Sequence, residues 1–219
     1  MEQNHLLGSN CRADVGDFGS GVAWTDHKIS FMTKHCSGKS VLDIGCVQHN
    51  PENYKSRYWL HKALAQVASE LEGIDSYEEG VRYLRGRGFN VFCDNAQNFD
   101  RGRVFDVIAA GDVIEHLENL EGFIESCKRH MHADSRLLIS TPNPWYWRNV
   151  VKAALYGDVN NNPEHTCWFC RRTLRQLVNR HGMDIGEVVF GSRYFRDRLM
   201  PLPRGLKHTS FHAEIFLVI

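Results

Sequence analysis

The 219-residue sequence predicts an α/β fold with a largely parallel sheet and helices on both faces, and three observations support this class. Short apolar runs alternate along the chain with segments of helical spacing, which is typical of strand–helix–strand units. Two of the apolar runs, 41–44 and 71–75, meet an acid and a glycine, as buried parallel strands do at a ligand-binding turn. No helical segment separates the last two apolar runs, so we expect them to be antiparallel neighbours.

The remaining elements follow from periodicity and from the residues that end each segment. Strands are expected at 41–44, 71–75, 89–92, 105–110, 136–140, 185–190 and 213–219. Helices are expected at 23–36, 57–69, 77–85, 117–130 and 172–181. Gly86 and Gly182 follow two of the helices, and Pro142 follows the fifth strand, where each residue type favours an end. Right-handed crossovers then bring the carboxyl ends of the parallel strands to one edge of the sheet.

The length suits one domain with some elaboration. Residues 1–22 are rich in Gly, Asn, Asp and Ser without any period, so we predict a flexible N-terminal arm. Residues 23–219 are predicted to form a single domain. Within it, the aromatic and Asn-rich segment 142–166 and the basic segment 192–210 are predicted to be insertions on the substrate side.

Composition narrows the class of protein. Lys plus Arg and Asp plus Glu number 26 each, so a neutral chain gives no electrostatic argument for nucleic acid or a membrane surface. No run of about 18 apolar residues is present, and the first residues lack the basic and apolar regions of a signal peptide. Seven scattered cysteines fit reduced thiols. We therefore expect a cytoplasmic protein that binds neither nucleic acid nor membrane.

Polar residues follow three successive strands of the predicted sheet. Gly45 allows a tight turn, but the glycines of a pyrophosphate-binding G-x-G-x-x-G are missing, and Asp43 would repel a phosphate. Asp75 could accept hydrogen bonds from both hydroxyls of a ribose. Asp94 and Asn95 could bind the edge of a base. Each acid taken alone is more often a cap or turn residue, but three at matching places favour a nucleoside site.

At these positions the chain resembles the class I S-adenosylmethionine-dependent methyltransferases of the small-molecule kind. The stretches that carry the resemblance are 41–46, 73–75, 94–96, 105–117, 137–142 and 165–169. The run Glu115-His116-Leu117 is similar to one in the ubiquinone-biosynthesis O-methyltransferase group. The resemblance covers about residues 38–219 and implies a Rossmann-like, seven-stranded, mostly parallel sheet with a C-terminal antiparallel hairpin.

The resemblance also implies S-adenosylmethionine as cofactor, which is cationic at sulfur and carries no pyrophosphate. The turn at Gly45 would lie under the methionine and ribose, Asp75 would bind the ribose, and Asp94 and Asn95 would face the adenine. The implied cofactor-binding residues are Asp43, Gly45, Cys46, Asp75, Ser76, Asp94, Asn95, Ala96, Gly111 and Asp112. The chain departs from the family where Val47 and His49 stand at positions that usually hold glycine, and 49–56 looks like an insertion.

Glu115, His116 and His165 are the predicted catalytic residues. Unperturbed histidine titrates near neutrality, so His116 and His165 are candidates for a general base if the acceptor is a hydroxyl. A structural hydrogen bond for His116 and a place near a helix cap for His165 remain the alternatives.

A metal ion is a further alternative at this point of the chain. Asp112, Glu115 and His116 would share one helical face at spacing i, i+3, i+4, and some ubiquinone-pathway relatives resemble this with a divalent ion at Glu-x-x-Glu-His. We predict a site without metal and leave this alternative open. Zinc at Cys167 and Cys170 is disfavoured, because no second cysteine pair stands at finger spacing.

Aromatic and basic residues point to the substrate side. Trp145 and Tyr146 could cover a sugar or aromatic ring, and Arg193 could bind a phosphate or carboxylate. Core packing and a solvated loop are the respective alternatives. An anionic or sugar-containing metabolite is therefore the expected substrate.

Together these observations predict a cytoplasmic S-adenosylmethionine-dependent methyltransferase that acts on a small molecule, most simply at oxygen. N- or C-methylation of a sugar intermediate, and a non-catalytic cofactor-binding protein of the same fold, are the alternatives. A nicotinamide-dependent oxidoreductase is disfavoured by the missing glycines. The sequence leaves a homodimer open.

Overall fold

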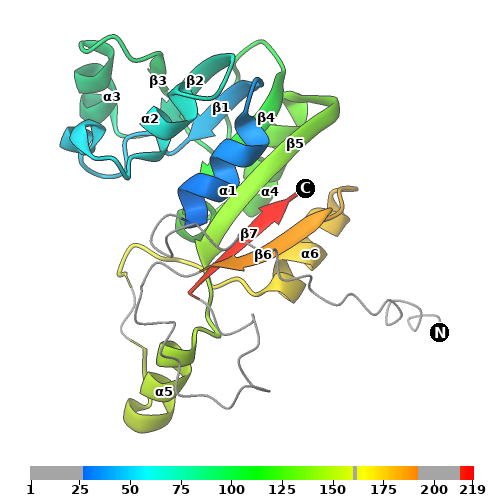
Figure 1. Ribbon diagram of the computed structural model, residues 1–219. Coiled ribbons are helices and arrows are strands. Elements are labelled where there is room, and N and C mark those ends of the chain that lie inside the picture. The colour runs from blue at the N-terminus through cyan, green and yellow to red at the C-terminus, as the bar shows by residue number, and fades with distance from the viewer. Residues whose placement is uncertain (1–26, 160–161, 192–212) are drawn as a thin grey trace.

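The computed structural model describes residues 27–159, 162–191 and 213–219. Within these residues seven strands form one sheet in the order β3-β2-β1-β4-β5-β7-β6 (Figure 1). The strands are β1 (Ser40–Ile44), β2 (Glu70–Asp75), β3 (Val91–Cys93), β4 (Phe105–Gly111), β5 (Met131–Pro142), β6 (Glu187–Gly191) and β7 (Glu214–Val218). Strands β1 to β5 pair in parallel, and β7 runs antiparallel to β5 and β6. The predicted α/β class and its antiparallel last pair are confirmed.

The helices alternate with the strands as expected, and one helix was not anticipated. They are α1 (His27–Cys36), α2 (Leu60–Ala65), α3 (Glu78–Arg85), α4 (Leu120–Arg129), α5 (Trp147–Tyr156) and α6 (Arg171–Arg180), with 3₁₀ turns η1 (Pro51–Lys55) and η2 (Ile114–His116). The predicted helix at 117–130 begins later, because the Asn119 side chain caps α4 by accepting from the Gly122 N–H. Helix α5 falls in the segment without clear period, because none of its residues is buried.

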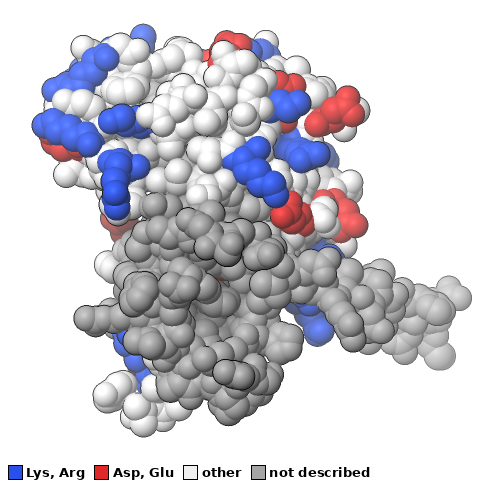
Figure 2. Space-filling model, viewed as in Figure 1, with Lys and Arg blue, Asp and Glu red and all other residues white. Residues whose placement is uncertain are grey.

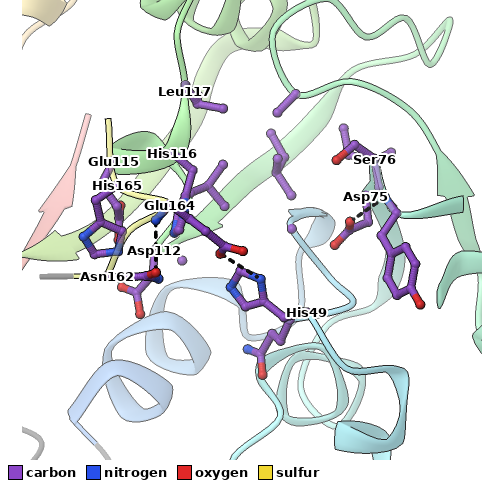
Figure 3. A pocket seen from close by; sticks show the side chains of 18 of the residues that line it. His49, Asp75, Ser76, Asp112, Glu115, His116, Leu117, Asn162, Glu164 and His165 are labelled. Carbon is purple, nitrogen blue, oxygen red and sulfur yellow. Dashed lines mark hydrogen bonds and ion pairs between the residues drawn. The ribbon is translucent and has the colours of Figure 1, made fainter. Parts of the chain in front are cut away.

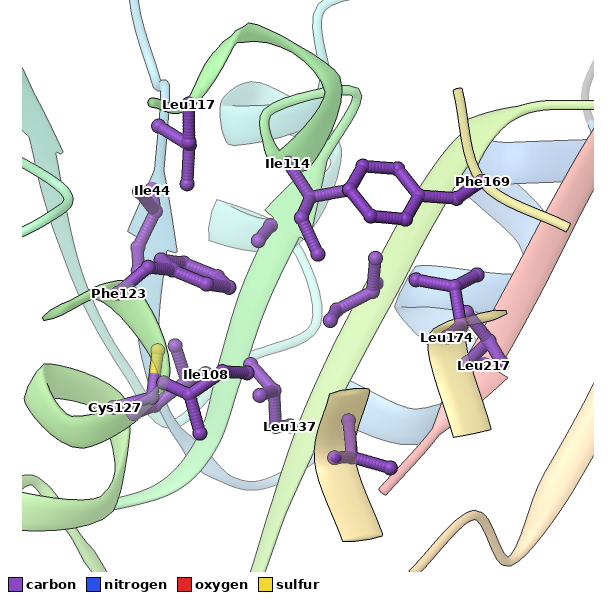
Figure 4. Packing of buried hydrophobic residues seen from close by; sticks show 14 of the residues in the cluster. Ile44, Ile108, Ile114, Leu117, Phe123, Cys127, Leu137, Phe169, Leu174 and Leu217 are labelled. Carbon is purple, nitrogen blue, oxygen red and sulfur yellow. The ribbon is translucent and has the colours of Figure 1, made fainter. Parts of the chain in front are cut away.

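The sheet carries one apolar cluster on each face. Alternate residues of each strand point to opposite faces, so Val41 packs with α1 and α2 while its neighbour Leu42 packs with α4 and α6. Figure 1 shows α1 in front of the sheet and α4 and α6 behind it. Figure 4 shows the larger cluster, in which Ile108 and Leu137 of neighbouring strands meet Phe123 of α4. Helices on both faces leave the strand ends open for a ligand.

A third cluster holds the turn that follows β1. Trp59 is buried against Cys46, Val47 and Val81, and its ring N–H donates to the Cys46 carbonyl at 2.7 Å. Phe89 packs edge-on against the Trp59 ring, with centroids 4.9 Å apart. The buried Trp59 indole therefore fixes the position of the residues that follow β1.

The distribution of surface charge and the hydropathy of the helices complete the description of the fold. Basic and acidic side chains are interspersed over the described part of the face drawn in Figure 2. Among the described residues, none of the helices has the length and apolar character needed to cross a bilayer. The predicted arm at 1–22 and the predicted insertion at 192–210 lie outside the described residues.

Candidate active site

A cavity of about 1150 Å³ opens at the carboxyl ends of β1, β2, β3 and β4. This is the edge where ligands bind in open α/β sheets. The predicted residues that line it are Gly45, Asp75, Ser76, Asp94, Asn95, Ala96, Gly111, Asp112, Glu115, His116 and His165. Figure 3 shows Asp75 and Ser76 on one side of this cavity, with His116 and His165 on the other.

The turn after β1 has a left-handed backbone at three residues, of which only Gly45 is a glycine. Gly45 has φ +80°, and a Cβ added there would come within 2.7 Å of the Val113 side chain. Gln48 and His49 also have positive φ, 55° and 62°, which side-chain-bearing residues rarely adopt. The Asn53 side chain donates to the Gln48 carbonyl at 2.9 Å. Hydrogen bonds and packing thus impose the conformation that glycine would adopt freely.

Asp43 and Cys46 do not line the cavity, although the sequence placed both at the cofactor. Asp43 is buried, and its Oδ2 lies 2.9 Å from Nδ1 of the equally buried His61. Burial raises the pKa of Asp43, and the hydrogen bond to His61 opposes that shift. Cys46 is buried beside Trp59. Both residues therefore support the turn from the protein interior and do not contact the cavity.

Asp75 lies at the end of β2 and lines the cavity. Its Oδ2 accepts from the Val47 N–H at 2.9 Å, and its Oδ1 accepts from the Tyr77 N–H at 3.0 Å. A carboxylate offers about four lone-pair positions, so these two bonds leave acceptor capacity toward the cavity. The geometry can hold a pair of vicinal hydroxyls.

Asp94 follows β3 and is held by a cation from the next segment. The Arg101 guanidinium lies 3.7 Å from Asp94, bonds to Glu72 of β2 and stacks over Phe92 with 4.0 Å to the ring centroid. Asn95 and Ala96 line the cavity beside Asp94. This end of the cavity offers carboxylate and amide groups to a polar ring edge.

Asp112 sits on an unusual backbone at the end of β4. Its φ is +56°, and its N–H donates to the Ser140 carbonyl at 3.0 Å. Oδ1 accepts from the Ser140 hydroxyl at 2.8 Å, while Oδ2 lies 2.5 Å from the Lys28 ammonium of α1. The positive φ and the 3₁₀ turn that follows show that Asp112, Glu115 and His116 do not share an α-helical face. The helical arrangement behind the Asp112 metal alternative is therefore wrong.

Glu115 is almost fully buried at the base of the cavity, with 1% exposure. Its Oε2 accepts from the Thr141 hydroxyl at 3.1 Å. Burial, and then the charge of Asp112, raises the pKa of Glu115 to about 8. Its backbone carbonyl accepts from the N–H groups of Thr166 and Cys167, at 2.8 and 3.2 Å. This link brings the segment before α6 to the cavity.

Two imidazoles meet beside Glu115. The rings of His116 and His165 form an edge-to-face pair with centroids 4.7 Å apart. Burial lowers the pKa of His165, and the neighbouring His116 lowers it further. Helix α6 begins at Arg171, so His165 is too far from the helix to cap it. A largely neutral imidazole at this place can accept a proton.

The structure adds residues to the cavity that sequence reasoning missed. His49 lies 5.7 Å from the His116 ring and pairs with Glu164 at 3.4 Å (Figure 3). Lys28 and Glu214 also line the cavity. The replacement of a usual glycine by His49 was the only signal in the sequence, because the other positions carry no motif.

Two of the predicted substrate-side residues do not line the cavity, and the third is not described. Trp145 is exposed and Tyr146 is buried, and neither lines it. Arg193 lies outside the described residues. The described part of 142–166 contributes Pro142, Asn162, Glu164 and His165 to the cavity instead.

The fold and the cavity define a Rossmann-like protein with acids at the strand ends and without the glycines of a pyrophosphate-binding turn. The model of the methyltransferase domain family matches residues 23–188, and the chain belongs to this family.

Known proteins agree with this assignment. The mitochondrial ubiquinone biosynthesis O-methyltransferase of Bos taurus is 26% identical over 172 residues, which cover 71% of this chain and 44% of that protein. The chain spans about half the length of the curated relatives it matches.

Solved structures share the fold. An S-adenosylmethionine-dependent methyltransferase from Mesorhizobium loti aligns with a TM-score of 0.59 and 15% identity, covering 90% of this chain and 97% of that one. The N-methyltransferase NodS from Bradyrhizobium japonicum, in complex with S-adenosyl-L-homocysteine, aligns with a TM-score of 0.55 and 12% identity. It covers 91% of this chain and 88% of that one.

Proposed function

We propose that this protein transfers the methyl group of S-adenosylmethionine to a hydroxyl group of a small molecule. The observation that carries the proposal is that Asp75, the proposed ribose-binding acid, and the imidazoles of His116 and His165 line one and the same cavity. Family membership supports the cofactor, and the acids at the strand ends suit a nucleoside attached to a cationic sulfonium.

The proposed cofactor site uses the residues that line one side of the cavity. Asp75 and Ser76 would bind the ribose, and Asp94, Asn95 and Ala96 would face the adenine. Gly45, Gly111 and Asp112 would lie along the methionine portion, where a carboxylate complements the positive sulfur. Asp43 and Cys46 would act indirectly, by holding the turn.

The proposed chemistry is an in-line displacement at carbon. The acceptor oxygen forms a bond to the methyl carbon while the carbon–sulfur bond breaks and its electron pair stays on sulfur. The bound cofactor supplies the electrophilic methyl group, and His116 or His165 accepts the proton of the hydroxyl. Positioning can contribute up to about 7–11 kcal/mol in well-oriented systems, and a general base adds about 10²–10⁴-fold.

Oxygen is proposed as the accepting atom because two imidazoles line the cavity and could accept the proton of a hydroxyl. N- or C-methylation of a sugar intermediate is the alternative. An anionic acceptor stays a prediction, since Arg193 and its segment lie outside the described residues. A homodimer and a cytoplasmic location also stay predictions.

Calorimetric titration with S-adenosylmethionine, S-adenosyl-L-homocysteine and NADH tests the cofactor assignment. We expect micromolar binding of S-adenosylmethionine and S-adenosyl-L-homocysteine and no binding of NADH. If neither S-adenosylmethionine nor S-adenosyl-L-homocysteine binds, the cofactor assignment is wrong. Methyl-labelled S-adenosylmethionine incubated with hydroxylated, amine and sugar acceptors then tests the accepting atom. Labelled ether products support oxygen, and labelled amines without ethers contradict it.

A further inference from the structure

Three side chains that can bind a metal converge at the acceptor end of the cavity. Glu115, His116 and His165 each offer one ligand atom, and these atoms lie within 4.8 Å of one another (Figure 3). Two hydrogen bonds from the backbone of 166–167 to the Glu115 carbonyl hold the two segments together. The convergence is therefore built into the backbone.

Glu115 carries a second, independent indication of a ligand. Its side chain is 1% exposed, and among the described residues Oε1 has no hydrogen-bond partner, whereas Oε2 accepts from Thr141. A buried polar atom without a partner costs about 1–3 kcal/mol, so such atoms in native proteins call for an explanation such as an ion.

Asp112 differs from Glu115 in its hydrogen bonding, although the sequence suggested Asp112 as a metal ligand. Both of its carboxylate oxygens have protein partners, the Ser140 hydroxyl and the Lys28 ammonium. A cation near Asp112 would compete with the Lys28 ammonium, which lies 2.5 Å from Asp112 Oδ2, whereas Glu115 Oε1 is free of any such partner among the described residues.

We propose that Glu115, His116 and His165 bind a divalent transition-metal ion, with His165 rather than Asp112 as the third ligand. Two imidazoles and one carboxylate suit borderline ions such as Zn²⁺, Co²⁺ or Fe²⁺, whereas Mg²⁺ prefers oxygen ligands alone. Ligands of one ion with bonds of about 2.1 Å are at most about 4.2 Å apart, so at least one side chain rotates on binding.

Such an ion would lie beside the proposed acceptor. A bound ion of this kind lowers the pKa of a coordinated hydroxyl. In this respect the inference deepens the proposed function and rests on it, but binding of the ion itself requires no methyl transfer. Cofactor titration in the presence of a chelator tests the proposed function separately.

The test is a metal titration of the chelator-treated full chain, with Co²⁺ followed by visible absorption and Zn²⁺ by competition and calorimetry. We expect one ion per chain and no comparable binding of Mg²⁺. His116→Ala and His165→Ala should each weaken Zn²⁺ binding at least tenfold. Asp112→Asn should change it less than threefold.

His49→Ala is the matched control, because this imidazole lines the same cavity but is not part of the three-ligand cluster. Its Zn²⁺ affinity should equal that of the wild type. Circular dichroism checks folding of every variant, and His165→Gln replaces His165→Ala if the latter unfolds. No Zn²⁺ binding, binding that survives both imidazole deletions, binding lost in Asp112→Asn, or a preference for Mg²⁺ overturns the proposal.

Discussion

The Asp75 carboxylate at the end of β2 accepts a hydrogen bond from the backbone N–H of Val47, in the turn after β1, at 2.9 Å. Its other oxygen accepts from the Tyr77 N–H, just before α3, at 3.0 Å. The same side chain lines the cavity. One acid therefore joins the shape of the turn to the proposed ribose contact.

Replacement of Asp75 should weaken cofactor binding through both of these roles. We expect Asp75→Ala to reduce the affinity for S-adenosylmethionine at least tenfold, about 1.4 kcal/mol, in calorimetric titration. It should also lower the free energy of unfolding by about 1–2 kcal/mol, because two backbone donors lose their acceptor. Asp75→Asn keeps one acceptor oxygen, so its cofactor affinity and its free energy of unfolding should lie between those of the wild type and Asp75→Ala.

Glu78→Gln serves as a control for the Asp75 variants, since Glu78 is exposed on the neighbouring helix and does not line the cavity. Its cofactor affinity should match that of the wild type. An unchanged affinity in Asp75→Ala would show that the ribose assignment is wrong.

Gly45 should tolerate no side chain, for two reasons. Its φ is +80°, and an added Cβ would lie 2.7 Å from Val113 Cγ2. We expect Gly45→Ala to lower the free energy of unfolding by about 1–3 kcal/mol in urea titrations. Adding Val113→Ala should recover only part of this loss, because the backbone strain remains.

Gly86→Ala is the matched comparison for Gly45. Gly86 has φ −61°, and its nearest atoms to an added Cβ are 3.5 and 3.6 Å away. Alanine there should be neutral or slightly stabilising. Equal destabilisation by the two substitutions would contradict the conformation of the turn.

Thiol reactivity should follow burial. Cys93 is exposed, whereas Cys36, Cys46 and Cys127 are buried. Burial raises the pKa of Cys36 to about 12 and also raises the pKa of Cys46 and Cys127, so little thiolate forms at neutral pH. Iodoacetamide at pH 7.5 should label Cys93 in the folded protein and the buried three only in denaturant. Peptide mass spectrometry checks this order, and early labelling of Cys127 would show that its face of the sheet is open.

The sheet was predictable because burial on both faces leaves a clear trace in the sequence. Strand β4 reads as an uninterrupted apolar run at 107–110, since its alternate residues pack against helices on opposite faces. Helix α5 was missed for the opposite reason. Val151 and Leu155 of α5 are exposed, so its apolar residues follow no buried stripe.

The side of the cavity that we assign to the cofactor was also predictable, because strand ends place Asp75 and Asp94 at one edge of a parallel sheet. The side that we assign to the methyl acceptor was harder to predict. His49 reaches the cavity only because a left-handed turn, held by Asn53, aims it there, and Lys28 arrives from a helix on one face of the sheet. Neither position carries a local pattern that distinguishes it from a surface residue.

A final prediction concerns pH and the edge of the sheet opposite the cavity. The Ser40 N–H and hydroxyl both donate to Asp106 Oδ2 at 2.8 Å, which joins the starts of β1 and β4. These bonds lower the pKa of Asp106 below its ordinary value of 3.8. A lowered pKa means that the stabilisation is present above about pH 3.8 and is lost as the pH falls through the folded-state value.

Asp106→Ala should therefore lower the free energy of unfolding by about 1 kcal/mol at pH 7, and this difference from wild type should shrink below pH 4. Urea titrations of the wild type, Asp106→Ala, Ser40→Ala and the double variant measure the coupling, which should be favourable at pH 7 and weaker at pH 3.5. A coupling that is independent of pH would contradict the ionised state assigned to Asp106.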